Sequence, residues 1–145
     1  MRRAILIVNV ISMVIFTVVN DVAKAERTNG FFPIKKTVTI TNALQSRAQV
    51  KLHCKSKDDD LGIRMLRYDD SFHFGFRPNI FFTTLFYCSF EWPGSGRVHW
   101  YDVYDDMAMN CINCKYLVKP FGLCKYNLQT HDYDKCEPWN NEEIV

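Results

Sequence analysis

Apolar and polar residues alternate one by one along most of this 145-residue chain, and this pattern constrains its fold most. Val38 and Ile40 alternate with threonines, while Phe72, Phe74 and Phe76 fall on the same face of their segment. A period of two residues is typical of a β-strand that is buried on one face. Beyond the N-terminal segment no long window keeps helical spacing, so the sequence predicts an all-β domain.

Turn-forming residues interrupt this alternation at short intervals and divide it into about eight predicted strands. The clearest of them lie at 37–41, 49–54, 71–76, 82–92, 98–104, 114–118 and 123–127. Short strands with close turns between them favour antiparallel pairing in a sandwich or a barrel. Large rings on the shared strand faces are expected to fill the core: Phe72, Phe74, Phe76, Phe86, Phe90 and Trp92.

The first 25 residues have the features of a signal peptide. A short basic start precedes an apolar run from 4 to 19, and residues 23–25 (Ala-Lys-Ala) have the small side chains that a signal peptidase requires. This run of about 16 residues is too short to span a bilayer, which takes about 20. The sequence therefore predicts a signal peptide at 1–25 and a secreted, extracellular domain at 26–145, with no stable membrane insertion.

The predicted secreted domain is electrically balanced. The whole chain has 18 Lys and Arg against 16 Asp and Glu, and removal of residues 1–25 leaves 15 of each. Binding to nucleic acid or to an anionic membrane draws on an excess of Lys and Arg. We therefore expect neither of these as a partner, and we expect the domain to be a monomer.

All six cysteines lie in the predicted secreted part: Cys54, Cys88, Cys111, Cys114, Cys124 and Cys136. In an oxidising compartment, an even number of cysteines is typical of disulfides. Loop-closure entropy favours a long bridge between Cys54 and Cys136. Neighbouring strand faces suggest that Cys88 pairs with Cys114, and a turn between Cys111 and Cys124 suggests a third bridge.

The Cys111-Ile112-Asn113-Cys114 motif has two other interpretations, a redox pair or half of a zinc site completed by Cys124, His131 or Cys136. A redox pair requires a helix after the motif, whereas the residues that follow are a predicted strand. The spacing to the later cysteines does not match paired zinc knuckles. Structural disulfides are the favoured interpretation, and no metal or other cofactor is predicted.

The four histidines, His53, His73, His99 and His131, are the candidates for acid-base catalysis. None has a nucleophile elbow, a paired-carboxylate motif or a His-Glu-x-x-His run beside it. Each is interpreted as a surface histidine, and no catalytic residue is predicted. A secreted hydrolase or ribonuclease that uses His53, His73 or His99 is retained as the alternative function.

Clusters of aspartate mark several turns, but none has the spacing of a calcium-binding loop. Aspartate is favoured in turns because its side chain bonds to the local backbone. Charged loops on a rigid frame are also where binding proteins make contacts. We therefore expect contacts from loops at 57–60, 93–97, 105–110 and 130–134. The candidate partner-binding residues are Lys57, Asp58, Asp59, Asp60, Arg97, Asp105 and Asp106.

Six blocks of the sequence match, in order, the signatures of a known family. They are HCKSKDDDLG at 53–62, FHFGFRPN at 72–79, TTLFYCSFEW at 83–92, CINCKY at 111–116, GLC at 122–124 and YDKCEPW at 133–139. Together they resemble the plant self-incompatibility S-protein homologue family, from about Thr37 to Trp139. Tyr116 departs from the pattern, because the family usually has Trp there.

The resemblance implies a small secreted β-sandwich stabilised by disulfides. The best understood members of the family are ligands secreted by the stigma, which pollen recognises through a membrane receptor and which trigger rejection of self pollen. The resemblance favours a secreted recognition or signalling protein with a cell-surface receptor as its partner. A secreted defence effector that acts on membranes is a further alternative, against which the balanced charge and the lack of an amphipathic helix argue.

Overall fold

The computed structural model describes residues 7, 9, 11–13, 33–109 and 111–139. The chain divides into two units, Met1–Phe32 and Pro33–Val145. The described residues of the first unit are helical, and no helix in the described part of the chain is long and apolar enough to cross a membrane. The predicted cleavage point after Ala25 lies outside the described residues.

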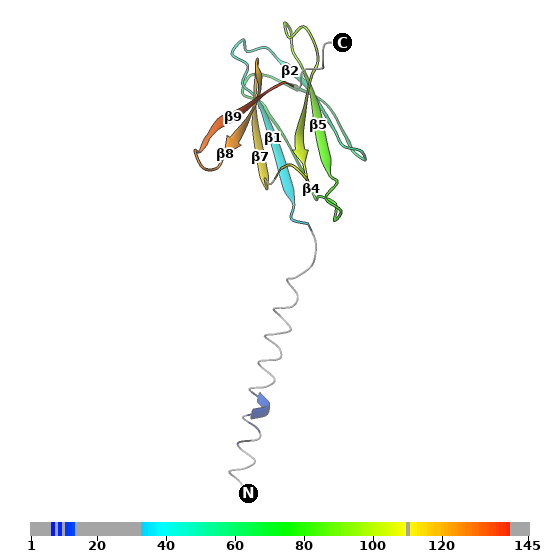
Figure 1. Cartoon of the computed structure of the whole chain (residues 1–145), viewed down its shortest axis with the longest axis vertical. Coiled ribbons are helices and arrows are strands. Elements are labelled where there is room, and N and C mark those ends of the chain that lie inside the picture. Colours follow the sequence, from blue (N-terminus) through cyan, green and yellow to red (C-terminus); the bar gives the residue numbers. More distant parts are fainter. Residues whose placement is uncertain (1–6, 8, 10, 14–32, 110, 140–145) are drawn as a thin grey trace. The chain divides into compact units, whose positions relative to one another are not determined.

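The second unit contains two β-sheets that pack against each other (Figure 1). One sheet has the strand order β4-β1-β7-β8-β9, and the other has the order β3-β2-β5-β6. The strands are β1 (Lys36–Asn42), β2 (Val50–Lys55), β3 (Asp60–Leu66), β4 (Ser71–Phe76), β5 (Leu85–Glu91), β6 (His99–Asp105), β7 (Asn113–Lys119), β8 (Gly122–Asn127) and β9 (Asp132–Pro138). The predicted small β-sandwich is confirmed.

Strands β3 and β9 are the two elements that the alternation does not predict. Each lies at an edge of its sheet, and most of its side chains are exposed. Alternation arises where one face of a strand is buried and the other is in water. These two strands bury little on either face, so their sequences lack the signal.

One strand pair departs from the antiparallel expectation. β1 and β7 run parallel, with Val38 opposite Cys114 and Ile40 opposite Tyr116, while the other six pairs of the described strands are antiparallel. Neighbours in sequence joined by short turns must pair antiparallel, but β1 and β7 are far apart along the chain. Their parallel pairing places β1 inside its sheet, between β4 and β7.

Aromatic rings fill the space between the sheets, as the alternation predicts. At one end of the sandwich, the ring centre of Phe76 lies 4.5 Å from that of Phe86 and 4.7 Å from that of Tyr104. At the other end, Phe90 packs on Trp139 at 5.0 Å. Full burial of such a side chain stabilises the fold by about 1.5 to 3 kcal/mol. The packed rings hold the strand ends from which the loops project.

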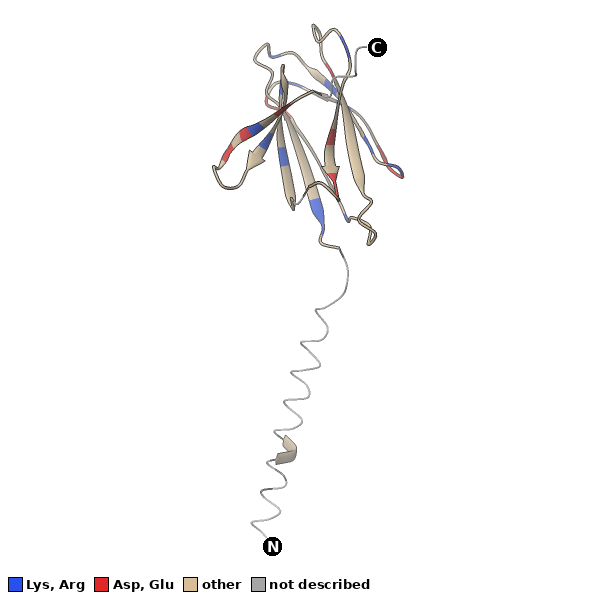
Figure 2. Cartoon of the chain, in the orientation of Figure 1, with Lys and Arg blue, Asp and Glu red and all other residues tan. Residues whose placement is uncertain are grey.

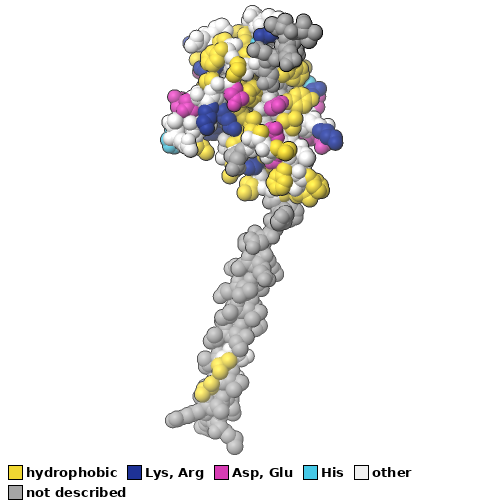
Figure 3. Space-filling model, viewed as in Figure 1, with side chains coloured by type: hydrophobic (Ala, Val, Ile, Leu, Met, Phe, Trp, Pro, Cys, Tyr) yellow, Lys and Arg dark blue, Asp and Glu magenta, His cyan; other side chains and the backbone are white. Residues whose placement is uncertain are grey.

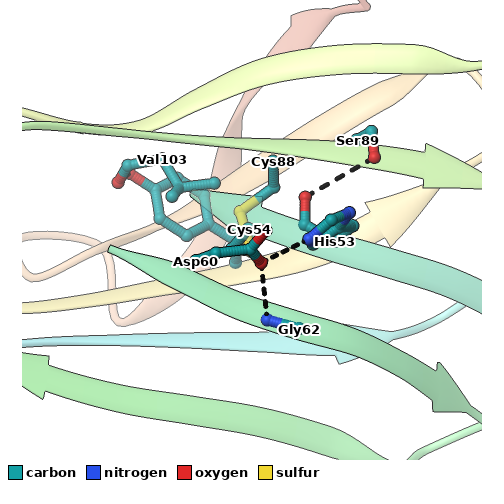
Figure 4. Close-up of a disulfide and its surroundings, with 8 residues drawn as sticks. His53, Cys54, Asp60, Gly62, Cys88, Ser89 and Val103 are labelled. Atoms are coloured by element: carbon teal, nitrogen blue, oxygen red, sulfur yellow. Dashed lines mark hydrogen bonds and ion pairs between the residues drawn. A yellow bond between two sulfur atoms is a disulfide. The ribbon is translucent and has the colours of Figure 1, made fainter. Parts of the chain in front are cut away.

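All six cysteines are in disulfides, but none of the three predicted pairings is correct. The bridges are Cys54–Cys88, Cys111–Cys114 and Cys124–Cys136. Cys54 and Cys88 are directly opposite each other on β2 and β5, and their Cα atoms are 4.0 Å apart (Figure 4). The cysteines of the third bridge are likewise opposite each other, on β8 and β9.

Two of the predicted bridges, Cys54–Cys136 and Cys88–Cys114, would have joined cysteines of different sheets. In the structure Cys54 instead lies directly opposite Cys88 on the adjacent strand, with the two Cα atoms 4.0 Å apart, which is within the reach of a disulfide. Adjacent strands meet this requirement directly. The third predicted bridge fails because Cys124 already lies opposite Cys136. Strand neighbourhood therefore decides the pairing, and loop-closure entropy does not.

Candidate recognition surface at one end of the sandwich

Three loops meet at the end of the sandwich where β2, β4 and β6 finish. They are the β2–β3 loop (56–59), the β4–β5 loop (77–84) and the described part of the β6–β7 loop (106–109 and 111–112). The backbone amide of Asp106 donates to the carbonyl oxygen of Thr84 at 3.0 Å, which ties two of the loops together. We call these three loops the β4–β5 end.

A surface hollow of about 460 Å³ lies between the first two of these loops. Lys57, Asp58 and Asp59 line one side, and Arg77 and Asn79 are on the other. Figure 2 shows charges of both signs at the tip of the β2–β3 loop and few on the β4–β5 loop. Phe76 and Leu85 also line the hollow, so it offers apolar surface together with cationic and anionic groups to a partner.

Ser56 orders the β2–β3 loop. Its hydroxyl oxygen accepts from the backbone amides of Asp58 at 3.3 Å and Asp59 at 3.0 Å. Its own amide donates to the carbonyl oxygen of Asp59 at 2.8 Å. Serine favours such turns because its hydroxyl reaches backbone groups two or three residues ahead. The carboxylates of Asp58 and Asp59 thus project from a turn that their neighbour fixes.

Asn79 orders the β4–β5 loop. Its side-chain Oδ1 accepts from the amides of Phe81 at 3.0 Å and Thr83 at 3.1 Å, and its Nδ2 donates to Thr83 Oγ1 at 2.6 Å. Its backbone amide donates to Thr84 Oγ1 at 2.8 Å, and its carbonyl accepts from the amide of Phe82 at 3.3 Å. Asparagine is suited to this role because its side chain both accepts and donates.

The tip of the β4–β5 loop consists of exposed apolar side chains. Ile80, Phe81 and Phe82 have 58%, 77% and 68% of their surface exposed. The alternation predicts a strand from Phe82 onward, and this is wrong. Phe82 has a φ of +56°, in the left-handed region that a strand does not use, and β5 begins at Leu85. The turn-forming Arg77-Pro78-Asn79 run was the available sequence signal for a loop here.

The seven predicted partner-binding residues do not form one group. Five lie at or beside the β4–β5 end, where β2 and β6 finish: Lys57, Asp58, Asp59, Asp105 and Asp106. Arg97 lies in the β5–β6 loop, at the opposite end of the sandwich. The sequence did not single out the apolar tip beside them, because Phe82 was assigned to a strand.

Asp60, the seventh, is the first residue of β3. Its carboxylate contacts His53 Nε2 at 2.6 Å and accepts from the amide of Gly62 at 2.9 Å (Figure 4). It also contacts Lys55 Nζ at 3.2 Å. These bonds, above all the one with His53, lower the pKa of Asp60 well below its usual value. Asp60 therefore stabilises the pairing of β2 with β3, and its carboxylate already has His53 and Lys55 as partners.

His53 is the histidine that comes nearest to a catalytic arrangement. Its Nε2 faces Asp60, and Ser89 lies on the neighbouring strand. The Ser89 hydroxyl, however, donates to the main-chain oxygen of His53 at 3.5 Å and not to the ring (Figure 4). A serine nucleophile needs the ring nitrogen as its base. These described side chains therefore do not form a serine–histidine pair.

His99 is buried, which corrects the prediction of a surface histidine. Only 7% of its surface is exposed, because it points inward from β6 and stacks on Trp92 at 4.8 Å. Trp139 packs beside it at 5.1 Å. His73 and His131 are exposed, as predicted.

The side chains considered for zinc have other positions in the structure. Cys111, Cys114, Cys124 and Cys136 are used in disulfides, and His131 lies in the β8–β9 turn. Within the part of the chain that the structure describes, no group of three or more His, Cys, Asp or Glu side chains is placed to hold a metal ion.

Comparison with known proteins relates this sandwich to one plant family. The family model described as plant self-incompatibility protein S1 matches residues 37–139. S-protein homolog 4 of Arabidopsis thaliana is 40% identical over 114 residues, which are 74% of this chain and 74% of the relative. S-protein homolog 29 of the same plant is 34% identical over 143 residues, which are 97% of this chain and 100% of the relative.

A solved structure has the same fold. It belongs to the self-incompatibility protein homologues, described as a widespread family of small, highly stable, secreted proteins from plants. Its TM-score is 0.52 at 16% identity, and the match covers 75% of this chain and 97% of that one. The family match, the sequence relatives and the disulfide-bonded sandwich agree, and the chain belongs to the plant self-incompatibility protein S1 family.

Proposed function

We propose that this protein is a secreted ligand that is recognised by a receptor on the surface of plant cells. The observation that carries the proposal is the β4–β5 end, where two loops ordered by their own hydrogen bonds border an open hollow. Membership of a family of secreted plant proteins supports the compartment and the class of protein.

Order in the loops before binding favours recognition. Ser56 and Asn79 hold the two loops in place, and the disulfide Cys54–Cys88 ties the strands β2 and β5 that carry one end of each. A loop that is already ordered loses little conformational entropy when it binds. The bound form of such a surface is close to its free form, which raises affinity without requiring a large interface.

Charges of both signs around the hollow favour a specific protein partner. Lys57 and Arg77 face the same hollow as Asp58 and Asp59. A mixed pattern attracts a partner with the complementary pattern and repels others, so it contributes to specificity and association rate. An excess of one sign would instead favour polyanions or any charged surface.

The experiment is a binding assay of fluorescently labelled secreted protein on intact plant protoplasts. We expect saturable binding that excess unlabelled protein competes away and that surface proteolysis of the protoplasts abolishes. Reduced and alkylated protein, which lacks the folded loop end, is the control and should not compete. Binding that does not saturate, or that survives proteolysis of the protoplast surface, contradicts the proposal.

A charge variant tests the hollow within the same assay. Asp58→Asn with Asp59→Asn should lower the association rate severalfold at low ionic strength, because steering by charge is lost, and the difference should shrink as salt is added. Asp60 is kept, since it pairs with His53 and Lys55. The control is Asp69→Gly, which removes an exposed carboxylate of the β3–β4 loop at the opposite end and suits the positive φ of this residue. Equal rates for all three proteins would remove the β2–β3 loop from the proposed site.

A further inference from the structure

The most exposed run of large apolar side chains in the described domain is the tip of the β4–β5 loop, residues 80–82, which we call the apolar tip. Figure 3 shows hydrophobic side chains gathered at the lower end of the domain, where Figure 1 places this loop. Exposed side chains of this size normally collapse onto the protein surface or are avoided. A contiguous exposed group marks an interaction site.

The backbone holds the apolar tip outward. Five hydrogen bonds involve Asn79, and Phe82 has a φ of +56°, which costs free energy for a side chain with a ring. Gly or Asn would adopt this left-handed backbone at a lower free-energy cost, so the presence of Phe at position 82 indicates a role for its ring. The strain is stored where the rings are displayed, which is typical of a binding loop.

The surroundings of the apolar tip identify the class of partner. The hollow beside it carries two carboxylates, Asp58 and Asp59, and two cations, Lys57 and Arg77. Membrane-inserting surfaces combine apolar side chains with an excess of Lys and Arg, because bilayers are anionic. Here Asp58 and Asp59 balance Lys57 and Arg77, so the tip has no cationic excess and a lipid surface is a poor match.

A second copy of the chain is also a poor match. The hollow next to the apolar tip has apolar side chains in its lining, but Lys57, Asp58, Asp59 and Arg77 line it as well. Insertion of two phenylalanine rings there would remove water from charges without giving them partners, which is costly. An apolar anchor surrounded by a polar, charged rim is instead the usual composition of a site for a different protein.

We propose that the apolar tip is the anchor of the receptor interface, and that the receptor has an apolar pocket for Phe81 and Phe82 with cationic side chains beside it that meet Asp58 and Asp59. This rests on the proposed function, and it names the element that dominates binding. The two rings enter the pocket, while the hollow and its charges form the rim.

The test measures equilibrium binding to plant plasma-membrane vesicles prepared from the protoplasts of the first assay. The variant is Phe81→Ala with Phe82→Gly, because Gly adopts the left-handed backbone without strain and neither change creates a glycosylation sequon. We expect binding at least about tenfold weaker, as for loss of a central aromatic anchor. The matched control is Phe121→Ser in the β7–β8 turn, which is 63% exposed at the opposite end and should bind as wild type.

A second variant separates the rings from their positioning. Asn79→Ala retains both residues, Phe81 and Phe82, but removes the side-chain hydrogen bonds that order the loop. We expect weaker binding than wild type and tighter binding than the double variant, because the rings remain while order must be acquired on binding. Thermal unfolding of each variant verifies that the sandwich is intact.

Two further measurements test a lipid surface and a second copy as the partner of the apolar tip. The first is binding to protein-free liposomes made from the lipids of the same vesicles, and the second is sedimentation of the protein alone. Liposome binding that the double variant loses would assign the tip to lipid, and a dimer that it loses would assign the tip to a second copy; either result overturns the proposal. Unchanged vesicle binding by the double variant refutes this inference alone. Absence of saturable binding by the wild type refutes the proposed function and this inference together.

Discussion

At the scale of the residue, His99 shows how the core changes the chemistry of one side chain. The imidazole stacks on Trp92, packs against Trp139 and is almost fully removed from water. Burial, with a smaller contribution from the charge of Arg97, lowers the pKa of His99 below its usual value of 6.5. The neutral ring is therefore the form that the fold accommodates.

We expect the stability of the domain to fall as the pH drops below about 6.5. Above this pH, His99 is neutral in both states; below it, the unfolded chain takes up a proton that the folded chain accepts only at lower pH. Urea unfolding at pH 8, 6.5 and 5 measures the effect. His99→Phe keeps the stacking but cannot titrate, and should flatten this dependence.

The control is His73→Gln, which changes an exposed histidine of β4. Its unfolding free energy should depend on pH in the same way as that of wild type. The low pKa of Asp60 does not interfere, because the stability that it contributes is lost only as the pH falls below its usual value of 3.8. A wild-type unfolding free energy that is constant from pH 8 to 5 would contradict the prediction.

At the scale of the element, the disulfides are links between neighbouring strands. Cys54–Cys88 joins β2 to β5, and Cys124–Cys136 joins β8 to β9, each across directly paired positions. Cys111–Cys114 closes a short turn at the start of β7. The two sheets are thus reinforced separately, and contacts across the core hold them together.

Removal of each bridge should therefore destabilise the domain according to the chain length that it closes. The separations are 34, 12 and 3 residues. In the chain-entropy model, the Cys54→Ala/Cys88→Ala variant loses about 4 kcal/mol, Cys124→Ala/Cys136→Ala about 3, and Cys111→Ala/Cys114→Ala less than about 2. Urea unfolding of the three variants measures the order.

Peptide mapping without reduction verifies the bridges in the wild-type protein. The expected linked peptides contain Cys54 with Cys88 and Cys124 with Cys136. A peptide that links Cys54 to Cys136 would show that the sheets are cross-linked and would contradict both the pairing and the predicted order of stabilities.

At the scale of the whole molecule, two tyrosine hydroxyls connect the sheets through the core. Tyr116 of β7 donates to the carbonyl oxygen of Val103 at 2.8 Å, and Tyr101 of β6 donates to Glu137 Oε2 of β9 at 2.7 Å. Val103 has no partner in the register of β5, because the β5–β6 ladder shifts at this point. The Tyr116 hydroxyl, which comes from the opposite sheet, gives the carbonyl of Val103 the donor that the irregular ladder does not provide.

We expect Tyr116→Phe to lower the free energy of unfolding by about 1 to 3 kcal/mol, because the buried carbonyl of Val103 would lose its donor. Tyr101→Phe is the matched control and should cost less, since Glu137 is exposed and water replaces the lost bond. Urea unfolding compares the two variants. A larger loss for Tyr101→Phe would show that the bond to Glu137, and not the one to Val103, is the stronger connection.

The sequence alone determined the features that depend on local pattern. Strands β1, β2 and β4 to β8 were predictable from the alternation, because burial of one face of a strand imposes a period of two residues. The aromatic core followed from the same periodicity, and the even number of cysteines indicated that they form disulfides. The family blocks extended over the same strands and turns.

Only the tertiary structure decided which strands become neighbours. The disulfide pairing and the grouping of loops at each end follow from these neighbours. Strand order brought Cys54 to Cys88, put β1 parallel to β7, and placed Lys57 beside the apolar tip while Arg97 lies at the other end. Phe82 continued the period of its strand, yet the bonds of Asn79 turn it outward. Alternation records which face of a strand is buried; pairing depends on the packing of two whole sheets, which no local segment contains.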